Sequence, residues 1–273
     1  MDPNDHNTVD TTSPNAARVY DYWLGGGRNF AADRKLGERI EVLQPNIRQI
    51  ARANRAFMTR AVQFAALDGI DQFLDLGCGI PTVGNVHEIA CDTRPHARVV
   101  YVDTEPVAVA HMRQTLGRGS PHAVVQADFC RPEIVLDLVE KTGVLDLRRP
   151  VCLLGVALLH FIAPEREPER HLATYRTAVA PGSLLVLSHV TVDGVPEELA
   201  RNAMRVRDAY EQTSTPGCFR TAAEFTALFR GWSLVDPPGV TWAPLWHPEH
   251  GVDLGGDDPA TSMLRVGAAR KLG

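Results

Sequence analysis

The sequence lacks an apolar run long enough to cross a membrane. The longest strongly apolar stretch, VCLLGVALLHFIA at residues 151–163, contains a histidine and falls short of the roughly 20 residues that a spanning helix needs. The N-terminus also lacks a basic start followed by an apolar core, which is the pattern of a secretory signal. We therefore expect no membrane segment and a cytoplasmic protein.

Cysteines are few, and their spacing is not that of a structural framework. Their number is odd and no Cys-x-x-Cys pair occurs, which disfavours both a disulfide framework and a zinc site. We expect no metal, and we expect the five cysteines to behave as small buried apolar residues: Cys78, Cys91, Cys130, Cys152 and Cys218.

The chain also has no excess of positive charge. Its formal net charge is −5, and lysine and arginine are spread along the chain, so there is no basic stripe for a phosphate backbone. Nucleic acid is therefore not expected as a partner. The 273 residues, 44% of them hydrophobic, are enough to bury the core of one α/β domain with additions.

The N-terminal quarter of the chain predicts a helical cap. Residues 1–12 are polar and predict a disordered tail. Ser13 followed by Pro14 is typical of a helix start, and the glycines at 25–27 should end that helix. Apolar residues then recur every three to four positions up to residue 67, apart from a break at Pro45. Residues 13–67 thus predict a cap or lid made of helices.

From residue 68 to 273 the pattern predicts the main domain. Short apolar runs alternate with helical segments from residue 72 onward, and SLLVLSHV at 183–190 predicts a fifth strand. Such alternation indicates an α/β fold: a doubly wound, mostly parallel sheet covered by helices on both faces. A helical insertion is expected at about 196–230, surface loops at 236–261, and edge strands near Leu234 and at 263–268.

Glycines and carboxylates follow the first three predicted strands. FLDLGCGIP at 73–81 places Asp75, Gly77 and Gly79 at a strand-to-helix turn, and the next two strands end at Asp103 and Asp128. In a parallel sheet these ends share one edge, which is where ligands bind. Glycine lets a ligand approach the backbone, and a carboxylate accepts hydrogen bonds from ribose hydroxyls. The conjunction predicts a nucleoside-binding site.

The details of the glycine turn favour a cationic ligand over a dinucleotide. Thr82 stands where a dinucleotide fold would have its third glycine, and Pro81 lies within the loop. Asp75 would repel a pyrophosphate, whereas a ligand with a cationic head suits this carboxylate. An NAD-dependent oxidoreductase is therefore the less favoured alternative.

Several blocks of the sequence resemble a known enzyme family. DLGCG, Asp103, the Ala-Asp pair at 127–128 and the strand PVCLLGVALLHF resemble the successive motifs of class I S-adenosylmethionine-dependent methyltransferases. The blocks ARVYDYWLGGGRNFAADR, ARANRAFMTRAV, GIDQFLDLGCGIPTVGNVHE and APGSLLVLSH resemble a bacterial S-adenosyl methyltransferase family once catalogued as a domain of unknown function. The similarity extends from about Ser13 to Trp246, and residues 247–258 match nothing in that family.

The resemblance implies a seven-stranded Rossmann-like sheet that binds S-adenosylmethionine, with S-adenosylhomocysteine as product. Asp75, Gly77 and Gly79 would line the methionine part of the cofactor. The other implied contacts are with the ribose (Asp103, Thr104), the adenine (Asp128, Phe129) and the methyl group (residues 156–158, beginning with Val156). Structural alternatives remain: Asp103 as a helix N-cap, Asp128 as a turn cap and Phe129 as a core residue.

Two histidines are candidate catalytic bases. His160 follows the fourth strand and His189 ends the fifth, so both face the ligand-binding edge and could deprotonate an acceptor hydroxyl or amine. The alternative is that they only pack or cap. Methyl transfer itself needs chiefly placement of the acceptor and exclusion of water, because the sulfonium is an activated donor.

The segment VYDYWLGGGRNFAADR at 19–34 combines aromatic side chains with flexible backbone and predicts a lid over the cofactor. Tyr20 or Trp23 would face the sulfonium, and Arg28 and Phe30 would face the methionine end, with Arg28 a candidate for its carboxylate. The alternative is a purely structural role, in which Tyr20 and Trp23 pack between the cap and the sheet.

The favoured function is S-adenosylmethionine-dependent methyl transfer to an O, N or C nucleophile of a small-molecule acceptor. A sensor or partner protein that binds S-adenosylmethionine without catalysis is the non-enzyme alternative, since the sequence shows no unambiguous catalytic base. The two differ in whether any acceptor is turned over.

Overall fold

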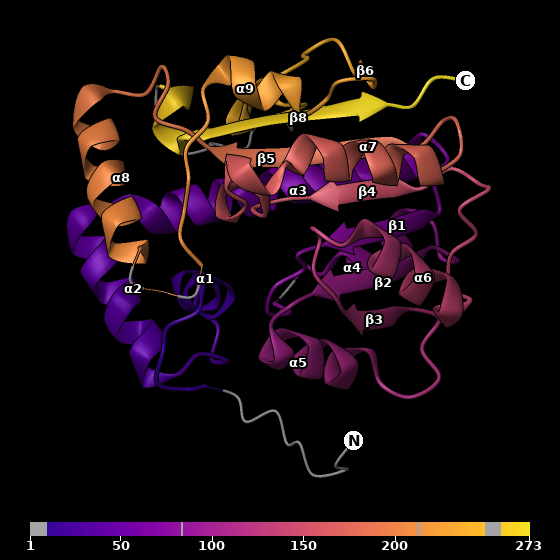
Figure 1. Ribbon diagram of the computed structural model, residues 1–273, viewed down its shortest axis with the longest axis horizontal. Helices are drawn as coiled ribbons and strands as arrows, with labels where there is room; N and C mark the ends of the chain where they lie inside the picture. The colour runs from indigo at the N-terminus through magenta and orange to yellow at the C-terminus, as the bar shows by residue number, and fades with distance from the viewer. Residues whose placement is uncertain (1–9, 83, 212, 214, 249–257) are drawn as a thin grey trace.

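A single mixed sheet forms the centre of the molecule. The structure, a computed structural model, describes residues 10–82, 84–211, 213, 215–248 and 258–273. In these residues the strand order is β3-β2-β1-β4-β5-β8-β6, and β7 pairs with β8 (Figure 1). The strands are β1 (Gln72–Leu76), β2 (Arg98–Asp103), β3 (Ala123–Gln126), β4 (Cys152–Gly155), β5 (Leu184–Val190), β6 (Ser233–Leu234), β7 (Thr241–Trp242) and β8 (Leu264–Arg270).

Helices cover both faces of this sheet, as the alternating pattern predicted. Strands β1 to β5 are parallel, and side chains of β1 alternate between two cores. Phe73 packs in the core shared with α3 and α4, whereas Leu74 and Leu76 pack in the core on the opposite face. The helices are α1 (Ala16–Trp23), α2 (Ala31–Leu43), α3 (Ile47–Leu67), α4 (Val86–Thr93), α5 (Pro106–Leu116), α6 (Pro132–Thr142), α7 (Pro168–Ala178), α8 (Glu197–Tyr210) and α9 (Ala222–Ala227).

The C-terminal strand departs from the expected arrangement. The sequence predicted seven strands with an edge strand at 263–268, but β8 lies inside the sheet, antiparallel to β5 along its whole length. The two short strands β6 and β7 both pair with its other side, which brings the described strands to eight. Gly267 in the middle of β8 leaves room for the ring of Phe229, because a Cβ atom there would lie 3.1 Å from that ring.

A helical cap stands at one end of the sheet (Figure 1). Its own small core joins α1 and α2 to α8, through residues such as Val19, Ile40 and Tyr210. The cap therefore combines the N-terminal helices with a helix that lies more than 150 residues later in the chain. Among the described residues no helix has both the length and the apolarity needed to cross a membrane.

The N-terminal segment starts differently from its prediction. Helix α1 begins at Ala16, and its N-cap is Asn15, whose side chain accepts a hydrogen bond from the Ala17 N–H at 2.8 Å. Ser13 is not the cap; its carbonyl accepts from the guanidinium of Arg18 at 2.7 Å. Part of the predicted tail, residues 1–9, lies outside the described residues, as do residues 249–257 of the surface loop predicted at 236–261.

Candidate functional site

A cavity of about 540 Å³ lies between the carboxyl edge of the sheet and the cap. This volume is in the range of about 300–1,000 Å³ that is usual for small-molecule sites. The sheet wall is formed by the loops after β1 to β4: Asp75, 77–80, Thr82, 103–105, 127–129, 156–158 and Arg166. The cap wall is formed by the cap and segments packed on it: 15–17, Tyr20, Trp23, Leu24, Gln44, Ile47, Ile50, Ala51, Asn54, Arg55, Met58, 160–163, Val190, Ala203, Val206, Arg207, Tyr210, 215–219, Met263 and Leu264.

The glycine turn after β1 is held tightly to the neighbouring strand. The N–H groups of Gly77 and Cys78 both donate to the carbonyl of Val102, at 2.8 and 3.1 Å. Gly77 has φ +72°, and a Cβ atom there would lie 2.7 Å from Leu158 Cδ1. Only glycine fits at this position, because it must accept both the left-handed backbone and the close approach of the loop after β4.

Asp103 closes the turn while keeping acceptor capacity. Its Oδ2 accepts from the Gly79 N–H at 2.7 Å and its Oδ1 from the Glu105 N–H at 2.8 Å. Each carboxylate oxygen has two lone pairs, so each keeps one for a ligand hydroxyl. Burial raises the pKa of Asp103 despite these N–H donors, and the side chain lines the cavity. The alternative role of Asp103 as a helix cap accounts for its contact with the Glu105 N–H. It does not account for the lone pairs that remain free on the carboxylate.

Asp75 is a second buried carboxyl group in the sheet wall. Burial raises its pKa to about 7, the nearby Arg55 acts in the opposite direction, and the charge of Asp103 adds to the rise. Arg55 comes from α3, lines the cavity and donates to the carbonyl of Gly84 at 2.6 Å. The site thus brings two buried carboxyl groups and one arginine to the end of β1.

Asp128 and Phe129 line the cavity after β3. Asp128 accepts from the Cys130 N–H at 2.9 Å and from the guanidinium of Arg166 at 2.7 Å. The pKa of Asp128 is lowered, because these hydrogen bonds and the positive charges of Arg166 and Arg131 outweigh its burial. The ring of Phe129 stacks on Tyr175 with centroids 5.4 Å apart, so it packs largely in the core.

A chain of hydrogen bonds connects the loop after β4 to the cap. The Ala157 N–H donates to Ser188 Oγ at 2.9 Å, and the Ser188 hydroxyl donates to Asn54 Oδ1 at 2.6 Å. Asn54 then donates to the Tyr20 hydroxyl at 3.0 Å, which donates to the Ala51 carbonyl at 3.0 Å. Ala157 has φ +57°, an uncommon conformation for a residue with a Cβ atom, and this chain holds it there.

The two candidate histidines occupy different environments. His160 belongs to the cap wall, whereas His189 is fully buried and does not line the cavity. The ring nitrogens of His189 contact the Val190 carbonyl and the guanidinium of Arg220, the latter at 2.8 Å. Because Arg220 can only donate, Nε2 of His189 accepts and Nδ1 carries the proton. Both ring nitrogens of His189 are therefore engaged, Nδ1 with the Val190 carbonyl and Nε2 with Arg220.

Burial also keeps both histidines neutral. The pKa of His160 falls to about 4 through burial and the positive charge of Arg220, and the pKa of His189 falls well below its usual value for the same two reasons together with the neighbouring His160. An imidazole that resists protonation is a weak general base. The expectation that His189 faces the cavity is wrong, and His160 retains only contact with it.

The aromatic and glycine segment divides between the cavity and the core. Tyr20 and Trp23 line the cavity, but Arg28 and Phe30 do not. The guanidinium of Arg28 donates to the Pro81 carbonyl at 2.7 Å, and Phe30 packs with Ile80 under the guanidinium of Arg18. The prediction that Arg28 and Phe30 face the cavity relied on their closeness to Tyr20 in the sequence, and it is wrong. The chain reverses at the glycines and carries these two side chains toward the outside of the glycine turn after β1.

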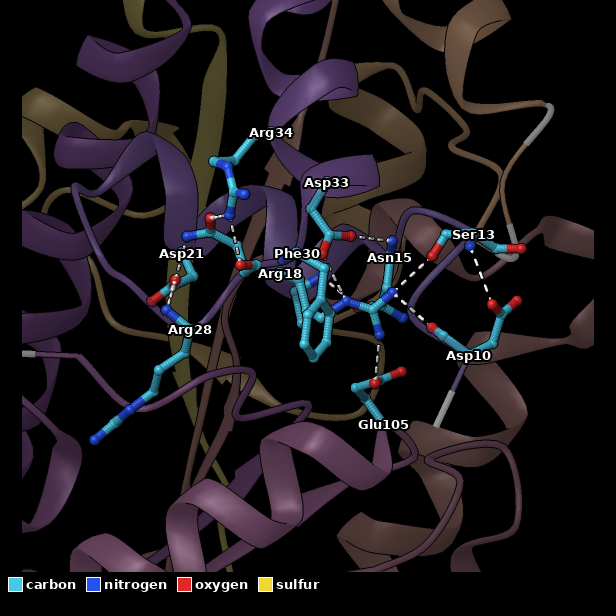
Figure 2. Close-up of polar contacts among 12 residues, drawn as sticks. Asp10, Ser13, Asn15, Arg18, Asp21, Arg28, Phe30, Asp33, Arg34 and Glu105 are labelled. Carbon is cyan, nitrogen blue, oxygen red and sulfur yellow. Dashed lines mark hydrogen bonds and ion pairs between the residues drawn. The ribbon is translucent and has the colours of Figure 1, made fainter. Parts of the chain in front are cut away.

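The middle one of the three consecutive glycines, Gly26, packs against the buried carboxylate of Asp21. Asp21 Oδ2 accepts from the backbone N–H of Arg28 at 2.9 Å and from the side chain of Asn29 at 2.8 Å (Figure 2). A Cβ atom on Gly26 would lie 1.9 Å from Asp21 Oδ1. The glycine run therefore makes room for an anchored turn.

Arg18 fixes the cap to the sheet edge through one buried and one partly buried ion pair. Its guanidinium contacts Asp33 of α2 at 2.9 Å and Glu105, next to Asp103, at 2.8 Å (Figure 2). A third nitrogen donates to the carbonyls of Asp10 and Ser13 at 3.2 and 2.7 Å. We call these residues the Arg18 clamp: Asp10, Ser13, Arg18, Asp33 and Glu105.

Sequence reasoning missed most of the cap wall. Asn54 and Arg55 of α3 and Tyr210 of α8 line the cavity. A signal for Asn54 existed, since Ala51, Asn54 and Met58 recur at helical spacing and so place a polar side chain on a buried face. No local pattern marks Tyr210, because only the tertiary fold brings α8 to the cavity.

Comparisons with known proteins agree with this architecture. A family model described as S-adenosyl methyltransferase matches residues 2–271. A Thermobifida fusca protein assigned as a methyltransferase is 36% identical, with a TM-score of 0.88 and coverage of 97% of each chain. A DUF574 family protein from Streptomyces avermitilis is also 36% identical, with a TM-score of 0.89 and coverage of 96% of this chain and 99% of that one. A search of curated proteins found no match.

Proposed function

This chain belongs to the S-adenosyl methyltransferase family, and from that membership we propose that it methylates a small molecule bound in the cavity between sheet and cap. It is an S-adenosylmethionine-dependent methyltransferase, and S-adenosylmethionine is its methyl donor. The observation that carries the proposal is the pair of buried carboxyl groups, Asp75 and Asp103, on either side of the glycine turn and facing a cavity of ligand size.

The donor groups of the sheet wall fit this cofactor. Asp75 would meet its ammonium group, because a raised pKa marks a carboxyl group that lacks sufficient positive charge around it. The remaining lone pairs of Asp103 would accept the ribose hydroxyls, with Thr104 beside them. Gly77 and Gly79 would allow the ligand to approach the backbone.

Arg55 is better placed than Arg28 to bind the carboxylate of the cofactor's methionine part. Arg55 lines the cavity beside Asp75, whereas Arg28 donates to Pro81 and lies outside the lining. A carboxylate bound by Arg55 next to an ammonium bound by Asp75 would match the zwitterionic end of an amino acid. We propose Asp128 and the backbone around Phe129 for the adenine, and Tyr20 for the region near the sulfonium, where an aromatic face attracts a cation.

The chain's own residues serve chiefly to position the reactants. The cofactor supplies a methyl group that is activated by the positive sulfur. Val156, Ala157 and Leu158 would shape the space beside it, and the chain of hydrogen bonds through Ser188 holds that loop in place. Aligning an acceptor in a dry cavity lowers the barrier without a covalent intermediate.

Proton removal is not assigned to a histidine. His189 is engaged with Arg220 and His160 resists protonation, so we propose that His160 contacts the acceptor as a hydrogen-bonding group. The acceptor must then be nucleophilic by its own ionisation or through a lone pair, and its proton passes to solvent. Replacing His160 by glutamine should raise KM for the acceptor more than it lowers kcat.

Isothermal titration with S-adenosylmethionine and S-adenosylhomocysteine tests the proposal. The wild-type protein should bind both, and Asp75→Asn should weaken binding at least about tenfold because the ammonium loses its counter-charge. The matched control is Asp137→Asn on α6, a surface carboxylate paired with Lys141, which should not change affinity. Absence of binding by folded wild-type protein would refute the proposed site.

A further inference from the structure

The cap wall differs in chemistry from the sheet wall, and this difference bears on the acceptor. Its apolar surface comes from segments far apart in the chain, including three aromatic rings and branched or flexible aliphatic side chains: Phe161, Tyr210, Phe219, Ile50, Val206 and Met263. Phe161 and Tyr210 pack together with ring centroids 5.9 Å apart. Surfaces of this kind bind flat ring systems through area and ring contacts.

Negative charge is confined to the other wall. The carboxylates among the described lining residues are Asp75, Asp103, Glu105 and Asp128, and all four stand at the ends of β1 to β3. The part of the cap wall that the structure describes has no carboxylate to pair with an ammonium group. A cationic acceptor would therefore be attracted to the carboxylates of the sheet wall, which the cofactor uses, and would have no counter-charge in the cap wall.

The arginines of the cap wall, Arg55 and Arg207, already contact other groups of the protein. Arg207 pairs with Asp208 at 2.9 Å, and Arg55 donates to Gly84 and acts on Asp75 at the sheet wall. Moving an anionic group into the apolar part of the cavity would cost its solvation without a compensating partner. The charges thus disfavour an acidic acceptor as well as a basic one.

Polar recognition in the cap wall comes from neutral groups. Gln44 is 1% exposed, and its Oε1 has no hydrogen-bond partner in the described structure. The hydroxyl of Thr215 is likewise buried without a partner there. A buried acceptor left unpaired costs about 1–3 kcal/mol, so a ligand donor that reaches Gln44 would recover that cost.

From this wall, and resting on the proposed function, we propose that the methyl acceptor is an uncharged aromatic ring compound carrying a hydrogen-bond donor. Its rings lie against the apolar part of the cap wall, and its donor meets Gln44 Oε1. Charge selects against acidic and basic analogues of the same shape, while the cofactor occupies the sheet wall.

Three probes that share the naphthalene ring and differ in charge test this proposal on the intact protein. Titrations are run with the protein saturated with S-adenosylhomocysteine, using 2-naphthol as the neutral probe, naphthalene-2-sulfonate as the anion and 2-naphthylmethylammonium as the cation. We expect 2-naphthol to bind at least about tenfold more tightly than either charged probe, which corresponds to about 1.4 kcal/mol. A charged probe that binds equally well or better overturns the proposal.

Adjacent positions on α8 provide a blocking variant and its control. Ala203 is 5% exposed and lines the cavity, so Ala203→Trp should fill the acceptor space and abolish binding of 2-naphthol. Met204, the next residue, is 37% exposed and outside the lining, so Met204→Trp should leave binding unchanged. Equal binding of 2-naphthol by both variants would place the probe elsewhere and contradict the proposal. If Ala203→Trp does not fold, the comparison of the three probes on wild-type protein decides alone.

The outcomes separate this proposal from the proposed function. Failure of folded wild-type protein to bind S-adenosylhomocysteine refutes the cofactor site itself. Binding of S-adenosylhomocysteine without binding of 2-naphthol leaves the cofactor site standing and refutes the neutral aromatic acceptor. Gln44→Leu adds a test of the polar contact, since it should weaken 2-naphthol binding several-fold without changing affinity for S-adenosylhomocysteine.

Discussion

Removing the guanidinium of Arg18 should destabilise the protein severely. In Arg18→Met, the apolar stem of the side chain is retained and the two ion pairs to Asp33 and Glu105 are lost. Asp33 is completely buried and keeps two N–H donors, from Asn15 at 2.9 Å and from Phe30 at 2.8 Å. It would nevertheless remain as a buried carboxylate without its cation.

The size of the effect follows from that burial. Breaking a buried ion pair from one side costs about 3–5 kcal/mol, whereas a whole domain is stable by about 5–15 kcal/mol. Arg18→Met should therefore remove at least about a fifth of the stability. Glu105→Gln should cost less, because the amide oxygen can still accept from Arg18 and the side chain is 13% exposed. Lys141→Met, which breaks an exposed pair on α6, should cost less than about 1 kcal/mol.

Urea denaturation followed by circular dichroism measures these differences. The midpoint should fall strongly for Arg18→Met with an unchanged slope, and Lys141→Met serves as the baseline. A loss below about 1 kcal/mol in Arg18→Met would show that the clamp contributes no more than a surface pair and would refute the reasoning. A separate early transition would instead show that the cap detaches before the sheet unfolds.

Four further predictions concern the cofactor site and the loop after β4. Because binding a cation favours the ionised form of Asp75, whose pKa is about 7, affinity for S-adenosylmethionine should rise about tenfold from pH 6 to pH 8 in titrations, and Asp75→Asn should abolish this dependence. In the protein without ligand, the pH dependence of stability has the opposite sign. The raised pKa of Asp75 stabilises the folded state at acid pH, and this stabilisation is lost as the pH rises through about 7. Thermal unfolding at a series of pH values measures this loss. Arg55→Ala should weaken cofactor binding at least about tenfold, whereas Arg28→Ala should leave it within about twofold; the reverse order would restore the contact predicted from sequence. Ser188→Ala should cost about 1–3 kcal/mol in urea unfolding, because Asn54 Oδ1 loses its buried donor, and an unchanged midpoint would contradict the role of this hydrogen-bond chain.

The sheet wall could be predicted from sequence because its determinants are local. A strand of about five residues ends in a turn, so Asp75, Gly77 and Asp103 follow directly from strand periodicity, and the parallel arrangement brings their loops together. The structure brings all the predicted residues of β1 to β4 to the cavity for this reason. Family resemblance then supplied the chemical identity of the ligand, which periodicity does not encode.

The cap wall could not be predicted in the same way. Tyr210 and Met263 reach the cavity through packing between segments that are distant in the sequence, and no periodicity records such contacts. Arg28 and Phe30 were assigned to the cavity because they neighbour Tyr20 in the chain, but the anchored turn around Asp21 directs them elsewhere. The internal position of β8 is also tertiary, since its seven residues read as a short edge strand until their partners are known.

The placement of β8 has a consequence for biosynthesis. This strand is formed by residues 264–270 and pairs with both β5 and the short strands beyond it, while Met263 and Leu264 close the cavity against the N-terminal cap. During translation the N-terminal helices emerge first, and they have no complete cavity to cover until residues past 270 have left the ribosome. The pairing of early and late segments makes the contacts long-range, which slows folding. A nascent chain arrested before residue 264 should thus expose an apolar cap without its partner surface, and chaperones bind such surfaces. Neither cofactor nor acceptor could stabilise the chain at that stage, because the cavity that binds them is incomplete.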